Sequence, residues 1–201
     1  MMELVFATNN PSKLAEIKNL LGDSFILKSL ADLGFNDEIP ETNPTIEENA
    51  SAKALFIYIR YAADCFADDT GLEVKALNNR PGVYSARFAE TEGKRLASPV
   101  DIADANIAKL LYLMQNKKNR EARFRTVISL VMGGKEYRFE GVVNGEIAFE
   151  RRGEAGFGYD PVFIPEGQCR TFAEMNIDEK NLISHRARAF GKLVDFLSAH
   201  G

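Results

Sequence analysis

Cysteine is scarce in this chain, and its two cysteines show no metal-binding spacing. Cys65 and Cys169 lie far apart, with neither a CxxC pair nor neighbouring histidines. This spacing argues against a disulfide framework and gives no indication of a zinc site. Long hydrophobic runs are also lacking, and residues 1–6 carry no basic segment ahead of an apolar stretch. We therefore expect a cytoplasmic protein with no membrane partner.

A strong charge of either sign is lacking as well. The 201 residues carry a formal net charge of -4. A nucleic-acid polymer requires a broad basic surface, which this balance does not provide, so we expect no such partner and only local binding of any phosphate. Hydrophobic residues at 45% and charged residues at 27% are ordinary globular values. The length predicts a single domain over residues 1–201, with two lobes.

The hydrophobic pattern predicts strands and helices in alternation, followed by a group of strands. Apolar runs at 3–7 and 25–30 predict strands, while amphipathic stripes predict helices. The expected helices begin near residue 11 and end at Gly22, run from 46 to 63, begin at a Ser98 cap, and begin near Lys180. Runs at 124–132, 135–143 and 146–150, joined by Gly133-Gly134 and Asn144-Gly145, predict an antiparallel meander. The expected fold is therefore α/β, with a mixed twisted sheet flanked by helices.

Two adjacent acids, Asp68 and Asp69, interrupt the apolar run that begins at Cys65. We place them at the end of a strand, before a Thr70-Gly71 turn and a second hairpin strand at 72–77. Successive strand side chains point to opposite faces, so the two acids are expected to have different roles unless the turn reorients one of them. The alternative is that Asp-Asp-Thr-Gly is an ordinary turn sequence.

The segment Thr8-Asn9-Asn10-Pro11-Ser12-Lys13 connects the first strand to the first helix. An Asn cap followed by Pro is a standard helix start. Free N–H groups there, together with Lys13 and the hydroxyls of Thr8 and Ser12, predict an anion site suited to phosphate. It is not a P-loop, because GxxxxGK[ST] is absent. A simple capped turn is the alternative.

The acidic loop at 36–41 and the helix that follows it supply further candidates. One acid of this loop is expected to be functional. Thr45 and Glu48 fit a capping box, which accounts for Glu48 structurally. Lys53 interrupts the apolar face of the helix, so it either extends from the edge of the core or contacts a ligand.

Two later segments also combine charge with special backbone. The glycine-rich loop at 153–161 carries two aromatic residues and an acid. Glycines let the backbone approach a ligand and a ring can stack on a base, although a long connector is the alternative. His185 and Arg186 fall in the first turn of the last helix, where the helix dipole disfavours cations. Helix stability does not explain that placement, so a ligand is the better explanation.

In this order, the segments resemble the Ham1/RdgB-type inosine triphosphate pyrophosphatases. The resemblance is carried by 7–13, 48–50 with Lys53, 67–72, 81–87, 156–161 and 184–186, which together span nearly the whole chain. It implies two lobes with a central cleft, as in Ham1 and Maf-like folds. It also implies a homodimer that uses Mg²⁺ to hydrolyse deaminated purine nucleoside triphosphates (ITP, dITP, XTP) to the monophosphate and pyrophosphate. This chain departs from many members at Asn9-Asn10, where they have Gly-Asn.

The resemblance assigns roles to the matching residues. Glu41 and Asp69 fall on the metal-binding acids and Asp69 on the proton acceptor, with Asp68 as the alternative base. Arg186 has only N–H donors, which suits the 6-oxo group of hypoxanthine. The remaining positions fall on substrate contacts: Thr8, Asn9, Asn10, Pro11, Ser12, Lys13, Lys53, Thr70, Phe157, Gly158, Tyr159, Asp160, Lys180, His185 and Arg186.

Two rival functions fit part of the pattern. A Maf-like pyrophosphatase for modified pyrimidine nucleotides would keep the carboxylates and change the base pocket. A non-catalytic nucleotide-binding or RNA-binding module would keep the lysines and the stacking ring, but it has no need for Glu41, Asp68 and Asp69 together. The acid cluster therefore disfavours the binding module.

Overall fold

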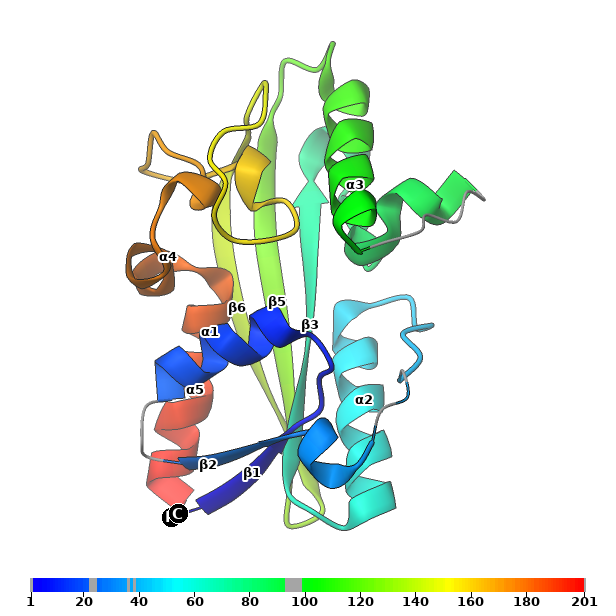
Figure 1. Cartoon of the computed structure of the whole chain (residues 1–201), viewed down its shortest axis with the longest axis vertical. Helices are drawn as coiled ribbons and strands as arrows, with labels where there is room; N and C mark the ends of the chain where they lie inside the picture. The colour runs from blue at the N-terminus through cyan, green and yellow to red at the C-terminus, as the bar shows by residue number, and fades with distance from the viewer. Residues whose placement is uncertain (1, 22–24, 36, 38, 93–98, 201) are drawn as a thin grey trace. The chain divides into compact units, whose positions relative to one another are not determined.

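The computed structural model describes residues 2–21, 25–35, 37, 39–92 and 99–200 (Figure 1). The strands are β1 (Met2–Phe6), β2 (Phe25–Ser29), β3 (Cys65–Val74), β4 (Arg80–Gly82), β5 (Glu121–Met132), β6 (Lys135–Ile147) and β7 (Phe163–Pro165). The α-helices are α1 (Pro11–Leu21), α2 (Ile46–Tyr61), α3 (Pro99–Met114), α4 (Ile177–Ile183) and α5 (His185–His200). The expected helix end at Gly22 and the cap at Ser98 lie outside the described residues.

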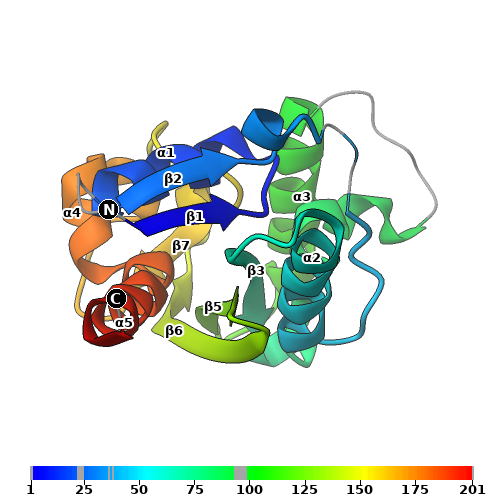
Figure 2. The ribbon, with the colours of Figure 1, turned by 90° about the horizontal axis from the view of Figure 1, so that it is seen from below.

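In this part of the chain, seven strands form one mixed sheet. The strand order is β2-β1-β3-β5-β6-β7, and β4 pairs with β3. Strand β1 is parallel to β2 and β3, whereas β4 is antiparallel to β3 and β7 is antiparallel to β6. Figure 2 shows β1 and β2 side by side. The predicted α/β class and the mixed sheet with flanking helices are confirmed.

The chain divides into two compact units. Unit 1 consists of Met1–Asp69, Thr126–Gly141 and His185–Gly201, and unit 2 consists of Thr70–Arg125 and Val142–Ser184. Strands β3, β5 and β6 contribute residues to both units. The units agree with the expectation of two lobes. The single-domain assignment and the central cleft stay predictions.

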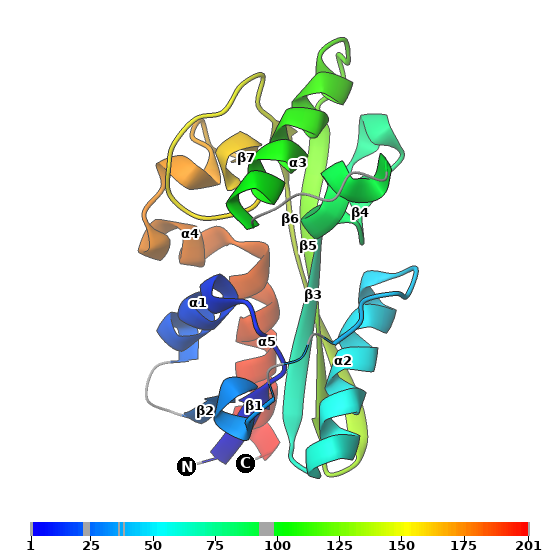
Figure 3. The same ribbon diagram turned by 45° about the vertical axis from the view of Figure 1, so that its right-hand side comes forward.

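Unit 1 has apolar side chains on both faces of its strands, because alternate residues of a strand point to opposite faces. Leu4, Phe6 and Phe66 pack in one cluster with residues of α1 and α5. Val5 and Ala67 pack in another cluster with residues of α2. In Figure 3, α1 and α5 lie on one side of β3 and α2 lies on the other. The two faces of β3 in unit 1 therefore meet different helices.

Unit 2 has its own apolar core. Helix α3 contributes Ile107 and Leu110, which are almost fully buried among aromatic rings of the strands and loops. Phe163 lies 4.7 Å from the ring of Phe124 and 5.4 Å from that of Phe172, measured between centroids. No helix in the described ranges is both long enough and apolar enough to cross a membrane.

The expected break after Asp69 is wrong. Strand β3 runs without interruption through Cys65–Val74, so Asp68 and Asp69 lie inside the strand and Thr70-Gly71 is not a turn. Residues 72–77 form no second hairpin strand, because 72–74 continue β3 and Lys75–Leu77 is a 3-10 helix. Most of β3 is buried. Packing on both faces therefore overrides the local turn preference of Asp, Thr and Gly.

The meander was predicted correctly at its first turn and incorrectly at its second. Gly133 and Gly134 form the expected tight turn, with φ of 56° and 78°. Asn144 and Gly145 instead lie within β6, and residues 148–150 are not a strand. Gly145 pairs with Pro165 of β7, and a Cβ there would lie 2.2 Å from the carbonyl oxygen of Ile164. This glycine permits the close approach of β7, a contact between remote segments that the local Asn-Gly turn signal does not indicate.

The final helical segment is also divided differently from the prediction. Helix α4 ends at Ile183, Ser184 is extended with φ -67° and ψ 152°, and α5 begins at His185. Lys180 therefore belongs to α4 and not to the last helix. The predicted position of His185 and Arg186 in the first turn of the last helix is confirmed.

The close approach at Gly145 predicts a loss of stability on adding a methyl group. Gly145→Ala should lower the free energy of unfolding by about 1–3 kcal/mol, because the methyl group meets backbone rather than a flexible side chain. Gly191→Ala is the matched control, since Gly191 lies in α5 and, apart from the local helix backbone, an added Cβ would meet no atom within 4 Å. It should raise stability by about 0.5–1 kcal/mol. Urea unfolding measures both, and equal effects would contradict the close approach.

Candidate active site

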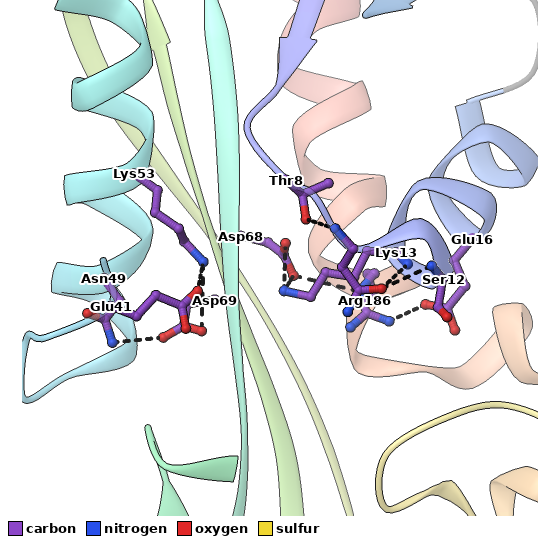
Figure 4. Close-up of polar contacts among 11 residues, drawn as sticks. Thr8, Ser12, Lys13, Glu16, Glu41, Asn49, Lys53, Asp68, Asp69 and Arg186 are labelled. Atoms are coloured by element: carbon purple, nitrogen blue, oxygen red, sulfur yellow. Dashed lines mark hydrogen bonds and ion pairs between the residues drawn. The ribbon is translucent and has the colours of Figure 1, made fainter. Parts of the chain in front are cut away.

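Asp68 and Asp69 point to opposite faces of β3 (Figure 4). Both carboxylates are buried, with exposed fractions of 1% and 6%. Asp68 contacts residues of α1 and α5, whereas Asp69 contacts residues of α2. The predicted separation of the two acids is confirmed, and it follows from strand alternation alone, because the turn that could have reoriented one of them does not exist.

Asp68 lies in a buried chain of alternating charges. Lys13 Nζ of α1 donates to Asp68 Oδ1 at 2.9 Å, and Arg186 Nε of α5 lies 3.7 Å from Asp68 Oδ2. Arg186 also forms an ion pair with Glu16 of α1. Glu16 is 5% exposed and was not identified from the sequence. Its signal was its spacing from Lys13, since residues three apart lie on the same helix face.

This chain of charges fixes the ionisation of Asp68. Burial alone would raise the pKa of its carboxyl, but Lys13 and Arg186, with Lys53 further away, lower it to about 2. Asp68 is therefore ionised and a weak base at neutral pH. Burial also lowers the pKa of the Lys13 ammonium, an effect that Asp68 opposes.

The charges around Arg186 change the interpretation of its placement. From the helix dipole alone, a cation in the first turn of α5 indicates a ligand. The structure supplies two carboxylates, Glu16 and Asp68, that compensate this cation within unit 1. The contact of Arg186 with a base stays a prediction. His185 beside it is 3% exposed.

Asp69 has a different set of partners on the other face. Asn49 Nδ2 of α2 donates to Asp69 Oδ2 at 3.2 Å, and Lys53 Nζ lies 4.0 Å from Asp69 Oδ1. Lys53 also forms an ion pair with Glu41. Burial and the Glu41 carboxylate raise the pKa of Asp69, while Lys53 opposes them. The pKa of Lys53 is raised, because Glu41 and both aspartates outweigh the effect of its burial. Asp69 is thus the stronger base of the two.

Glu41 and Asp69 fit a site for a hard divalent cation. Among the residues that the structure describes, no three acidic, histidine or cysteine side chains come together as a metal-binding group. Mg²⁺ requires fewer protein ligands, because it keeps several waters and is usually held by one or two carboxylates plus substrate phosphates. Both carboxylates here face one positive charge, the Lys53 ammonium. Two carboxylates that face the same positive charge are arranged as the ligands of a divalent cation would be.

The polar segment before α1 has its N–H groups bonded locally. Asn10 Oδ1 accepts from the N–H groups of Ser12 and Lys13 at 3.0 and 3.2 Å, and Thr8 Oγ1 accepts from Asn10 N at 3.2 Å. The predicted Asn cap is confirmed. An anion at this helix start competes with the Asn10 side chain for the same donors. Asn9 is exposed and donates from Nδ2 to Asp37 O at 2.9 Å, and Pro11 begins the helix.

Unit 2 contains a second cluster of candidate residues. Lys180 Nζ donates to Asp160 Oδ2 at 2.8 Å and lies 5.0 Å from the centroid of the Phe157 ring. Phe157 N donates to the same carboxylate at 2.9 Å. Gly156 has φ +76°, and a Cβ there would lie 2.2 Å from Asp160 Oδ2. The loop therefore closes on Asp160, which holds Phe157 and Lys180 near each other.

The remaining candidates of unit 2 differ in what their side chains do. Tyr159 is 3% exposed, and its hydroxyl donates to Ser85 O at 2.9 Å within the core of the unit. Burial raises its pKa. Phe157 is only half-buried, so it is the better candidate for stacking on a base. Gly158 has φ +61° with open space around it, and Thr70 is half-buried in β3.

Fold and site together define a class of protein. It is an α/β protein in which one strand carries two buried carboxylates, each beside a lysine, next to a capped helix start. Such a set suits a phosphorylated ligand and a hard cation. The model of the Ham1 family matches residues 4–196, and the chain belongs to the Ham1 family.

Similar proteins extend over almost the full length of the chain. A dITP/XTP pyrophosphatase of Flavobacterium johnsoniae is 49% identical over 98% of this chain and 99% of its own length. One of Porphyromonas gingivalis is 50% identical over 98% of each. Among solved structures, a HAM1 protein from Coxiella burnetii matches with a TM-score of 0.87 and 38% identity over 99% of this chain and 100% of its own.

The closed loop at Asp160 predicts unequal effects of two glycine substitutions. Gly156→Ala and Gly158→Ala both place a side chain at positive φ, which costs about 1–2 kcal/mol in each case. Only Gly156→Ala also displaces the Asp160 carboxylate from Lys180 and Phe157 N, so it should lose about 1–3 kcal/mol more. Urea unfolding measures the difference. Equal losses would show that the Asp160 contacts contribute little.

Proposed function

We propose that this chain hydrolyses deaminated purine nucleoside triphosphates (ITP, dITP and XTP) to the nucleoside monophosphate and pyrophosphate. The observation that carries the proposal is the buried Asp69 carboxylate, which lies 4.0 Å from Lys53, the lysine that also pairs with Glu41. The names of relatives that are 49% and 50% identical over nearly the whole chain support the substrate class. Such an activity would remove damaged nucleotides from the nucleotide pool.

Asp69 is proposed as the proton acceptor. Lys13 and Arg186 lower the pKa of Asp68 to about 2, which leaves Asp69 as the better candidate, and it would deprotonate the water that attacks the α-phosphate. Glu41 and Asp69 are proposed to hold Mg²⁺, which when bound neutralises charge on phosphate oxygens. Lys53 already contacts Glu41, so it is available in the same place to balance phosphate charge.

Asp68 is proposed to act through Lys13 instead of as a base. Its carboxylate holds the Lys13 ammonium at 2.9 Å, next to the start of α1. Lys13 and the polar segment Thr8 to Ser12 would then bind phosphate oxygens. Because Asn10 caps the N–H groups of Ser12 and Lys13, the phosphate would either displace that cap or bind through the side chains.

Two sets of residues are candidates for contact with the base. In unit 2, Phe157 offers a ring for stacking, next to Lys180, Asp160 and Gly158. In unit 1, His185 and Arg186 are the remaining candidates, with Arg186 as a donor to the 6-oxo group. Adenine presents an amino donor at that position, so ATP should be a poor substrate. A cytoplasmic homodimer is proposed on the family resemblance, and light scattering of the purified protein tests the dimer.

The reaction is tested by its metal requirement and its products. With Mg²⁺, dITP and XTP should release pyrophosphate, ATP should release far less, and a chelator should abolish turnover until Mg²⁺ is restored. A coupled assay distinguishes pyrophosphate from orthophosphate, after contaminating inorganic pyrophosphatase is excluded. Orthophosphate as the first product would contradict attack at the α-phosphate. A preference for pyrimidine nucleotides would favour the Maf-like alternative.

A further inference from the structure

Asn49 of α2 is a fully buried carboxamide that is hydrogen-bonded at both ends. Its exposed fraction is 0%. Its Nδ2 donates to Asp69 Oδ2 at 3.2 Å, and its Oδ1 accepts from the backbone N–H of Asn43 at 3.0 Å. Asn43 lies in the same loop as Glu41. Figure 4 shows the bond from Asn49 to Asp69. Together with the bond to Asn43, one side chain connects Asp69 on β3 to the loop that carries Glu41.

Helix stability does not account for this residue. The backbone N–H of Asn49 makes the ordinary helical bond to Thr45 O at 3.1 Å, and the helix is capped by Thr45 Oγ1. Asparagine has a low helix propensity, and a buried carboxamide is costly unless its hydrogen bonds are made. Its neighbours on the buried face include Ile46 and Ala50, so an apolar residue would suit the packing. The side-chain bonds are what distinguish asparagine at this position.

The bonds of Asn49 determine how the Asp69 carboxylate is turned. Oδ2 is engaged by Asn49, which leaves Oδ1 as the oxygen that faces Lys53 at 4.0 Å. Lys53 in turn contacts Glu41. Asn49 therefore restrains both Asp69 and the Glu41 loop, so that the two carboxylates face one positive charge.

We propose that Asn49 is a positioning residue that sets the affinity of the Glu41–Asp69 pair for a divalent cation. This inference rests on the proposed function, since that function assigns the pair to metal binding. Residues that orient metal ligands typically change metal affinity or activity by about 10–100-fold when they are replaced. Asn49 itself contacts neither metal nor substrate in this role.

Direct binding of Mn²⁺ to the substrate-free protein tests the proposal. Mn²⁺ serves as the probe because its free ion is detected by electron paramagnetic resonance. Asn49→Leu keeps the approximate volume but makes neither bond, and it should raise the Kd for Mn²⁺ by about tenfold or more. Asn49→Ser, which retains one hydroxyl, is the second variant if Asn49→Leu does not fold, and it should change the Kd in the same direction.

Asn106→Leu is the matched control. Asn106 is also a buried asparagine, at 4% exposure, and its side chain donates to the carbonyls of Ser85 and Ala86 and accepts from Ala89 N. It lies in unit 2 and has no place in the proposed metal site. Its replacement should lower stability and leave the Kd for Mn²⁺ within about twofold of wild type, as expected for a residue that shares no hydrogen-bond partner with Asn49.

Activity provides a second readout that a purely structural role would not change. Asn49→Leu should raise the Mg²⁺ concentration for half-maximal dITP hydrolysis by about tenfold and leave the KM for dITP at saturating Mg²⁺ nearly unchanged.

Equal Mn²⁺ affinities of wild type and Asn49→Leu would overturn the inference, as would equal shifts in Asn49→Leu and Asn106→Leu. The proposed function would stand if wild type still released pyrophosphate from dITP. Wild-type protein that bound no Mn²⁺ without substrate would overturn the inference, while the Mg²⁺ requirement of dITP hydrolysis would still test the metal site.

Discussion

The alternation of side chains along β3 is the constraint on which the candidate site depends. Because successive residues point to opposite faces, Phe66 and Asp68 meet α1 and α5, while Ala67 and Asp69 meet α2. Strand β3 is packed on both faces and continues through the acidic pair, so neither carboxylate is turned by a break in the strand. Two adjacent acids thereby acquire separate partners, and their pKa values move in opposite directions.

The buried carboxylates on the two faces of β3 are stabilised by different partners. On one face, Lys13 and Arg186 hold Asp68 ionised, and Glu16 balances the second cation. On the other, Asn49 donates to Asp69 and Lys53 lies 4.0 Å away, while burial and the Glu41 carboxylate raise the pKa of Asp69. A buried ion pair is generally weak evidence for stability. Here the buried ion pairs of Asp68 separate its pKa from that of Asp69, and acid–base chemistry requires such a difference between neighbouring acids.

Much of this arrangement could be predicted from the sequence, and the exceptions share a physical cause. The mixed sheet, the starts of α1 and α2, and the opposite orientations of Asp68 and Asp69 follow from local periodicity and capping. The turns expected at Thr70-Gly71 and Asn144-Gly145 do not exist, because packing on β3 and the approach of β7 to Gly145 are non-local. The spacing of Glu16 from Lys13 was a local signal, but its ion pair with Arg186 could not be predicted, because the two residues are remote in sequence.

The separation of roles is tested most directly by comparing Asp68→Asn with Asp69→Asn, in dITP turnover and in urea unfolding. Asp69→Asn should lower kcat by about 10² to 10⁴-fold, because it removes the base, with a modest effect on stability. Asp68→Asn should lower the free energy of unfolding by about 3–5 kcal/mol, since it leaves buried cations without their partner. If Asp69→Asn kept more than a tenth of wild-type turnover while Asp68→Asn did not, the two roles would be reversed.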